Sequence, residues 1–214
     1  MPAHIRIPSL LLLAALVWVV PAMAQTDFDA VEVRVTRVAD GIYLLTGSGG
    51  EIGLSGGADG AFIVDDQFAP LTDKIKAAIS TVTDRPVQWV LNTHWHGDHT
   101  GGNENFGSGG ALIVAHDNVY KRMNPAEFAD LVGNSQQSPD AALPVVTFDR
   151  TLTLHWNDED VFAFHVENSH TDGDVIVYYR GANVVHMGDT FFNGRYPFID
   201  VDSGGNVEGM IASA

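Results

Sequence analysis

Short apolar runs separated by turn residues dominate the pattern of hydrophobic and polar positions. Val31, Val33 and Val35 alternate with polar residues, which predicts a strand with one solvated face. The apolar runs that follow are separated by glycine-rich or polar turns, as in a sheet built of short strands. They predict strands at residues 42–45, 52–54, 61–64, 87–91, 111–115, 151–154, 162–166, 175–179 and 184–187.

Two segments have helical spacing instead. From Pro70 to Val82, apolar side chains recur every three or four residues, which predicts a helix with one face on the sheet. A shorter helix is expected from His116 towards Met123. Residues 124–144 contain three prolines and several polar residues, so an exposed loop is expected there. Strands with helices between them indicate one layered α/β domain.

The first 24 residues have the pattern of an export signal. Arg6 precedes an unbroken apolar run at residues 10–20, which is shorter than the about 20 residues needed to span a bilayer. Ala22-Met23-Ala24 is a small-x-small cleavage pattern, so cleavage is expected before Gln25. We therefore expect residues 25–214 to form a periplasmic or secreted domain with no membrane anchor.

Composition excludes several classes of protein. There are 11 Lys and Arg residues against 27 Asp and Glu, and the net charge of −16 argues against nucleic acid as a partner. The absence of cysteine excludes a disulfide-stapled mini-domain. With 45% hydrophobic and 18% charged residues, the chain can bury a core. These features favour a globular protein without a nucleic-acid partner.

Four good metal ligands follow a predicted buried strand within six residues: His94, His96, Asp98 and His99. Alternate side chains of an extended chain share a face, so His94 and His96 can converge on one ion. A turn at Gly97 directs Asp98 and His99 towards a second position beside it. Imidazoles and carboxylates are typical zinc ligands, and the spacing predicts two metal ions.

This segment resembles the signature of the metallo-β-lactamase superfamily, His-x-His-x-Asp-His at the end of a strand, and the match is complete. Two further segments, around His170 and Asp189, fit the same family. The resemblance implies an α/β fold of the αββα type, in which two sheets lie between helices. It also implies that His94, His96 and His170 ligate the first zinc ion, and that Asp98 and His99 ligate the second.

Asp189 is implied to contact the second ion or to bridge both. Many broad-spectrum β-lactamases have a cysteine at this position, whereas glyoxalase II-like hydrolases have an aspartate. Residues 191–198 resemble a segment of exported members that are called lactamase-like or quinoprotein-relay metallohydrolases. The chain is thus similar to an exported branch of the superfamily.

One departure concerns the second zinc ion. The family normally supplies it with a further histidine from near the end of the domain, but no histidine follows His186 here. The resemblance covers about residues 30–214 and leaves out the C-terminal part of the family. We therefore expect a fragment with an incomplete second half, weaker binding of the second zinc ion and reduced turnover.

The resemblance implies a zinc-dependent hydrolase. Zinc lowers the pKa of bound water towards about 7, so a metal-bound hydroxide can attack an amide, lactam or ester carbonyl. Asp98 is the catalytic candidate, because it can also orient or accept a proton. Two alternatives stay open: a glyoxalase II-like thioesterase, favoured by Asp189, and a non-catalytic periplasmic metal-binding accessory protein.

Other polar residues have expected supporting roles. Metal-bound imidazoles usually donate their outer N–H to a carboxylate or a carbonyl. Four carboxylates are candidates for that role: Asp65, Asp66, Asp172 and Asp174. Arg195 can bind a substrate carboxylate or form a structural ion pair. His116 is expected to cap or pack at the start of a helix, and His155 is expected to be solvated.

Overall fold

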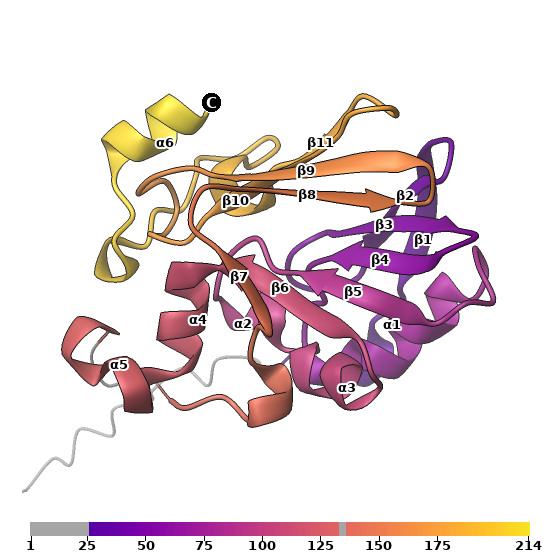
Figure 1. Ribbon diagram of the computed structural model, residues 1–214, viewed down its shortest axis with the longest axis horizontal. Helices are drawn as coiled ribbons and strands as arrows, with labels where there is room; N and C mark the ends of the chain where they lie inside the picture. Colours follow the sequence, from indigo (N-terminus) through magenta and orange to yellow (C-terminus); the bar gives the residue numbers. More distant parts are fainter. Residues whose placement is uncertain (1–25, 133–135) are drawn as a thin grey trace, which may run out of the picture.

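Two β-sheets face each other in the computed structural model, which describes residues 26–132 and 136–214 (Figure 1). The predicted export signal, residues 1–24, lies outside the described residues. The seven-stranded sheet contains, in spatial order, β1 (Arg34–Ala39), β2 (Ile42–Thr46), β3 (Ile52–Gly57), β4 (Gly60–Val64), β5 (Val87–Leu91), β6 (Leu112–His116) and β7 (Val146–Phe148). The four-stranded sheet has the order β11 (Val184–His186), β10 (Val175–Tyr179), β9 (Glu159–His165) and β8 (Thr151–Trp156).

The helices lie mainly in the connections. They are α1 (Thr72–Ile79), α2 (Gly97–Thr100), α3 (Asn103–Ser108), α4 (Asp117–Met123), α5 (Pro125–Val132) and α6 (Val207–Ser213). Short 3-10 turns occur at Phe28–Ala30, Ala69–Leu71, Asp140–Ala142, Gly188–Thr190 and Val201–Ser203. None of the helices in the described ranges has the length and apolarity needed to cross a membrane.

The first four strands of the large sheet are antiparallel, whereas β4 to β7 are parallel. Parallel neighbours need crossover connections, and α1 and α3 lie in two of them. The carboxyl ends of parallel strands meet at one edge of the sheet. Because Val64 pairs with Leu91, the residues that follow β4 and β5 lie side by side.

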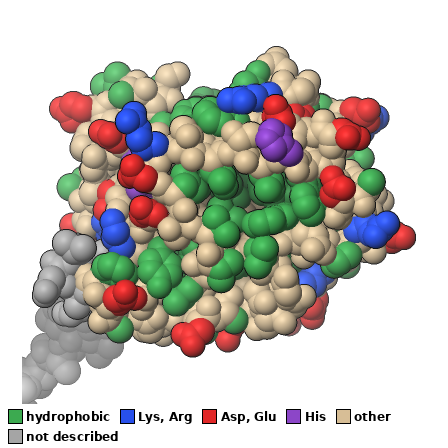
Figure 2. All heavy atoms as spheres, in the orientation of Figure 1, with side chains coloured by type: hydrophobic (Ala, Val, Ile, Leu, Met, Phe, Trp, Pro, Cys, Tyr) green, Lys and Arg blue, Asp and Glu red, His purple; other side chains and the backbone are tan. Residues whose placement is uncertain are grey.

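Two apolar cores hold the layers together. Ile75, Ile79 and Phe106 pack α1 and α3 onto the outer face of the large sheet. On its inner face, Phe62 and Leu91 belong to a second core that also includes residues of the small sheet. Figure 2 shows hydrophobic side chains in the middle of one face of the molecule, between the two sheets. Helix α6 lies at one end of the small sheet (Figure 1). Helices on the outer face of the large sheet, followed by two facing sheets, agree with the expected αββα sandwich.

The structure corrects two expectations. The first strand begins at Arg34 rather than Val31, because the Lys74 ammonium binds the carbonyls of Phe28, Asp29 and Val31 at 2.7–2.9 Å. Residues 124–144 are not all loop, since they contain α5 and a 3-10 turn. Pro125 is the first residue of α5, a position where its missing N–H costs no helical hydrogen bond.

Candidate metal centre

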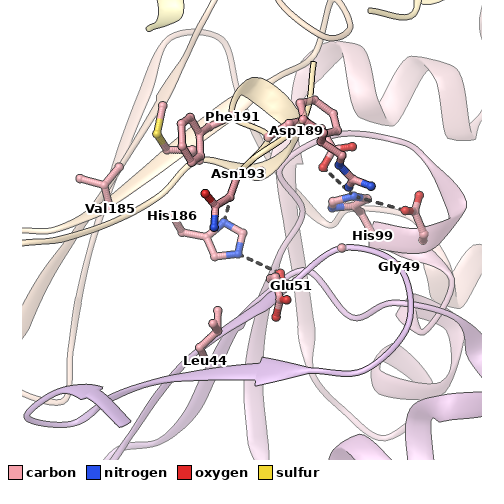
Figure 3. Close-up of a pocket in the computed structure, with 15 residues that line it drawn as sticks. Leu44, Gly49, Glu51, His99, Val185, His186, Asp189, Phe191 and Asn193 are labelled. Atoms are coloured by element: carbon pink, nitrogen blue, oxygen red, sulfur yellow. Dashed lines mark hydrogen bonds and ion pairs between the residues drawn. The ribbon is translucent and has the colours of Figure 1, made fainter. Parts of the chain in front are cut away.

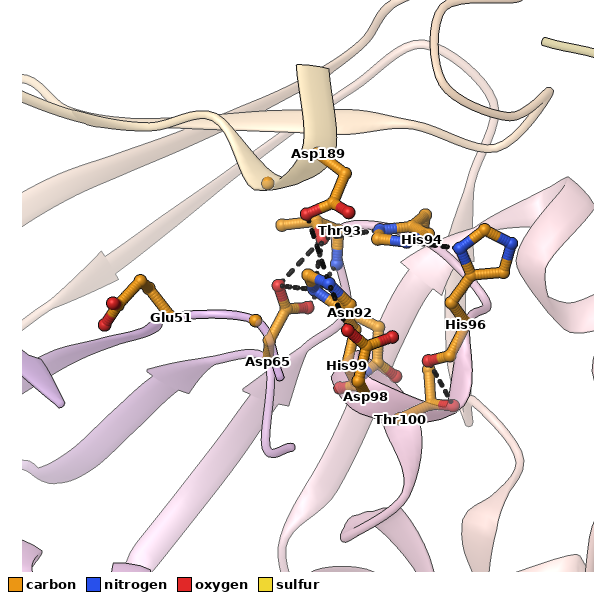
Figure 4. Close-up of polar contacts among 12 residues, drawn as sticks. Glu51, Asp65, Asn92, Thr93, His94, His96, Asp98, His99, Thr100 and Asp189 are labelled. Carbon is orange, nitrogen blue, oxygen red and sulfur yellow. Dashed lines mark hydrogen bonds and ion pairs between the residues drawn. The ribbon is translucent and has the colours of Figure 1, made fainter. Parts of the chain in front are cut away.

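The four predicted ligands lie where the chain leaves β5 and enters α2 (Figure 4). Asn92 anchors this passage, because its buried amide donates to the His99 carbonyl and to Asn103 at 3.1 Å. The carbonyl of His96 then accepts the N–H groups of His99 and Thr100 at 3.0 Å, which starts the short helix. This turn brings His99 back beside His94, with ring centroids 4.1 Å apart.

Three imidazoles form a first group, the three-histidine group of His94, His96 and His170. Nδ1 of His96 lies 3.1 Å from Nε2 of His94 and 3.0 Å from Nε2 of His170. His170 comes from the loop between β9 and β10, 74 positions from His96. The structure therefore brings together the three residues that the resemblance implies for the first zinc ion.

The outer nitrogens of these rings are all hydrogen-bonded. Nε2 of His96 donates to the Asp200 carboxylate at 2.8 Å, and Nδ1 of His170 donates to the Phe198 carbonyl at 2.8 Å. Nδ1 of His94 lies 3.1 Å from the Thr93 hydroxyl oxygen. These contacts leave one nitrogen of each ring facing the centre of the group, as metal-binding histidines require.

A second group is made by His99, Asp189 and Asp98. Nε2 of His99 lies 3.2 Å from an Asp189 oxygen and 3.7 Å from an Asp98 oxygen. A ring nitrogen of His94 also lies within 4.8 Å of a ring nitrogen of His99 and a carboxylate oxygen of Asp189, so the two groups adjoin. Asp98 stands at the edge of the second group, outside the compact set formed by His94, His99 and Asp189.

Burial and neighbouring groups shift the pKa values of two of these histidines in opposite directions. Burial, together with the neighbouring imidazoles, holds the pKa of His94 well below its ordinary value, so this ring is neutral as a ligand must be. Burial opposes protonation of His99, but the carboxylates of Asp65 and Asp189 outweigh it and raise the pKa of His99. Within the described part of the chain, the buried Nε2 of His99 makes no hydrogen bond of good geometry, although an Asp189 oxygen lies 3.2 Å away. A cation between these imidazoles and carboxylates would satisfy that nitrogen, and zinc suits both kinds of donor.

Asp65 is the carboxylate that positions His99. It lies just beyond β4, with both oxygens buried, and accepts the His99 ring N–H at 2.7 Å. The same carboxylate accepts the backbone N–H of Thr93 at 2.7 Å and its hydroxyl at 2.8 Å. Asp65 therefore joins the ends of β4 and β5 to α2.

The other three carboxylate candidates have different partners. Asp66 accepts the N–H of Gly102 at 2.8 Å, and burial raises its pKa well above the ordinary value. Asp174 accepts the N–H and hydroxyl of Thr171. Asp172 forms a two-bond ion pair with Arg122 at 2.7 Å. These residues shape the surrounding loops rather than contacting the four imidazoles.

Sequence reasoning missed Asp200 and the carbonyl of Phe198. Asp200 lies 104 positions from its partner His96, and no spacing in the chain connects the two residues. Any carbonyl can accept a hydrogen bond, so the role of Phe198 has no sequence signal either. Phe198 is the last residue of the segment 191–198 that resembles exported family members, and Asp200 lies two residues beyond that segment.

A cavity of about 660 Å³ adjoins the second group, within the range of small-molecule sites (Figure 3). Asp98, His99 and Asp189 lie at the metal side of this cavity. Its remaining wall combines apolar and polar side chains, including Leu44, Glu51, Val185, His186, Met187, Phe191, Phe192, Asn193 and Arg195. A substrate in the cavity would therefore contact the second group directly.

Several candidate residues take supporting places. His186 lines the cavity and donates to the Glu51 carbonyl at 2.9 Å. The Arg195 guanidinium lies 5.2 Å from the centre of the Phe192 ring. Two further histidines behave as expected: His116 caps α4 by accepting the Asn118 N–H, and His155 is exposed beside Asp160.

Trp95 does not face the cavity. Its ring lies under the Arg122 guanidinium, 5.6 Å away, and packs on the apolar cluster of α4 and β6. The side chain between two predicted ligands therefore supports the site from the side of α4.

Known proteins that are similar to this chain belong to one family. A family model described as the metallo-beta-lactamase superfamily matches residues 53–213. Among solved structures, the DIM-1 metallo-beta-lactamase is 16% identical with a TM-score of 0.67, over 86% of this chain and 82% of that chain. A metallo-beta-lactamase from Pontibacter korlensis is 20% identical with a TM-score of 0.67, over 85% and 83%.

A third solved structure is the class B3 di-zinc metallo-beta-lactamase LRA-12 from an Alaskan soil metagenome. It is 20% identical with a TM-score of 0.59, over 74% of this chain and 61% of that chain. At these identities the likeness concerns the fold, whereas the family match spans three quarters of the sequence. This chain therefore belongs to the metallo-beta-lactamase superfamily.

Proposed function

We propose that this protein is a zinc-dependent hydrolase that acts on an amide, lactam or ester carbonyl of a small molecule. The observation that carries the proposal is the pair of adjoining donor groups. His94 of the first group lies next to His99 and Asp189 of the second, and the second group lines a cavity of about 660 Å³. Membership of the superfamily supports the same class of reaction, because solved structures with this fold include metallo-beta-lactamases. The export pattern of residues 1–24 supports a periplasmic or secreted enzyme.

The first zinc ion would be held by His94, His96 and His170, and the second by Asp98, His99 and Asp189. When bound, zinc activates water at neutral pH and polarises a carbonyl oxygen. The protein contributes rings whose outer nitrogens are already bonded, so the donors are oriented before the metal arrives. The second site has two carboxylates and one imidazole of its own, and we expect it to bind zinc more weakly than the first.

Asp98 is the proposed catalytic residue. Its side chain is 35% exposed, more than those of the other five proposed ligands, and it lines the cavity. A carboxylate there can orient a water molecule or take up its proton next to a bound substrate. Asp189 is more enclosed, and despite burial its pKa is lowered by His99 and the other imidazoles, which keeps it an anionic ligand.

A glyoxalase II-like thioesterase is the second candidate. The observation that favours it is the aspartate at position 189, whose oxygen lies 3.2 Å from Nε2 of His99. An oxygen ligand at this place distinguishes the chain from the cysteine-containing β-lactamases of the resemblance. The two candidates share the donor groups and differ in the carbonyl that they hydrolyse.

The test combines metal content with a substrate panel. Zinc per chain would be measured on the purified protein, and a chromogenic β-lactam, an aryl ester and a thioester would be assayed in parallel. We expect zinc-dependent turnover of the lactam or the aryl ester that is lost in His96→Ala and kept in His155→Ala, because His155 is exposed away from the donor groups.

Each other result has a defined meaning. Turnover of the thioester alone would support the second candidate. Bound zinc without turnover of any substrate would support a metal-binding accessory protein. Less than about one zinc ion per chain would overturn the assignment of both donor groups.

A further inference from the structure

One loop residue contacts two of the three histidines of the first group. Oδ2 of Asp200 accepts the Nε2–H of His96 at 2.8 Å. The backbone N–H of Asp200 donates to the carbonyl of His170 at 2.9 Å. Asp200 therefore binds the ring of one histidine and the backbone of another, although the three residues are far apart in the chain.

Asp200 is itself held in place. Ser203 donates its hydroxyl to Oδ2 at 2.6 Å and its backbone N–H to Oδ1 at 3.1 Å. The carbonyl of Asp200 accepts the N–H of Gly205 at 2.9 Å. These hydrogen bonds therefore hold the Asp200 side chain and backbone in the orientation that contacts His96 and His170.

The hydrogen bonds around Asp200 continue into the body of the protein. The carbonyl of Ser203 accepts the N–H of Asp172 at 2.9 Å, and Asp172 is ion-paired with Arg122 of α4 at 2.7 Å. The carbonyl of Phe198, two residues before Asp200, holds the ring of His170. Residues 198–205 thus connect two histidines of the first group to a partly buried ion pair.

We propose that Asp200 is the positioning residue of the three-histidine group, and that it sets the zinc affinity of this site by orienting His96. This inference rests on the proposed function, because it takes the three-histidine group to be a zinc site. A carboxylate on the outer nitrogen fixes the tautomer of the ring and makes the inner nitrogen a better donor. His96 depends on this contact more than its neighbours do, because its side chain is 21% exposed whereas those of His94 and His170 are almost fully enclosed.

The first measurement is zinc affinity, determined by competition with a chromophoric chelator for the wild type, Asp200→Asn, Asp200→Ala and Asp202→Ala. We expect about 10–100-fold weaker binding of the first zinc equivalent in Asp200→Ala, the usual effect of losing an outer partner. Asp200→Asn should lose less, because its amide oxygen can still accept the His96 N–H. Asp202 is an exposed acid of the same turn, so Asp202→Ala should bind zinc like the wild type.

The second measurement separates positioning from a merely structural role. In the zinc-loaded wild type, the His96 Nε2–H should give a protected imidazole proton signal in NMR spectra, which Asp200→Ala should lose. The absorption bands of the first Co²⁺ equivalent should change in the same variant, because the ring is no longer held. Both measurements would be made well below the unfolding temperature of the variant.

Failure of the inference differs from failure of the proposed function. If the wild type binds zinc tightly and Asp200→Ala binds it within about twofold, with an unchanged Co²⁺ spectrum, Asp200 does not position His96. Equal weakening in Asp202→Ala would also overturn the inference, because it would reduce the effect to loss of a nearby charge. A wild type that binds no zinc would instead reject the metal site itself.

Discussion

The carboxylate of Asp65 accepts both the ring N–H of His99 and the backbone N–H of Thr93, each at 2.7 Å. Asp65 follows β4, His99 belongs to α2, and Thr93 follows β5. One buried side chain thus holds a proposed zinc ligand at the point where two parallel strands end. The sheet register contributes to this contact, since the pairing of Val64 with Leu91 places Asp65 opposite Asn92, one residue from Thr93.

Replacing Asp65 with alanine should destabilise the fold and the second metal site together. The change leaves two buried N–H groups without their acceptor, and losing one partner of a buried ion pair costs about 3–5 kcal/mol. Urea unfolding should show this loss, and metal analysis should show fewer zinc ions per chain. Asp40→Ala is the control, because Asp40 is paired with Arg37 on the surface, and its unfolding curve should match the wild type. An Asp65→Ala protein with wild-type stability would contradict the expected role.

Gly50→Ala should disturb the position of the His99 imidazole by steric overlap. A Cβ atom at position 50 would overlap the His99 imidazole, which Asp65 holds in place. Overpacking of this kind costs about 1–3 kcal/mol, so thermal unfolding should shift downwards and the second zinc equivalent should bind more weakly. Gly97→Ala is the matched control, because a Cβ atom at position 97 meets no atom within 4 Å. Similar behaviour of the two variants would argue against a rigid His99.

Asp98→Asn should affect metal binding and turnover without affecting the fold. The Asp98 side chain is 35% exposed and stands at the edge of the second group, so the fold does not depend on its charge. Loss of an outer partner weakens metal binding about 10–100-fold, and loss of a direct ligand should cost at least as much for the second equivalent. Isothermal titration calorimetry with zinc would measure the affinities of both equivalents. A weaker first equivalent with an unchanged second would reverse the assignment of the two groups.

Much of the site was predictable because its ligands are close together in the sequence. His94, His96, Asp98 and His99 follow one strand, and the period of an extended chain followed by a turn suffices to divide them into two groups. The choice among the four candidate carboxylates was not predictable in this way. Asp65 and Asp66 are adjacent and both buried, and only the register of β4 and β5 determines that Asp65 faces His99.

In the fold, too, features set by neighbouring residues were predictable, whereas features set by contacts between distant residues were not. The strand at residues 87–91 was predicted with the observed bounds, because its apolar run ends at a clear polar boundary. The first strand was displaced by Lys74, which binds carbonyls more than 40 positions away. Asp200 belongs to this second kind of feature, since its contact with His96 exists only once the loop has folded over the site.

The stacked pair of His116 and His165 should make the stability of the protein depend on pH. Their rings lie 3.7 Å apart and nearly parallel, and His116 is buried at the start of α4. Burial, and next the neighbouring His165, lower the pKa of His116 from its ordinary value of about 6.5. Below that pH the unfolded chain therefore binds more protons at His116 than the folded chain does. The free energy of unfolding should fall as the pH falls through this range.

The variant His116→Asn tests this dependence. Asparagine can still cap α4 by accepting the Asn118 N–H, but it does not titrate. We expect urea unfolding between about pH 7.5 and about pH 5.5, on either side of the ordinary histidine pKa, to show a shallower loss of stability than in the wild type. One group contributes at most about 1.4 kcal/mol per pH unit, which sets the upper limit of the difference in slope. An unchanged slope in His116→Asn would assign the dependence to other groups.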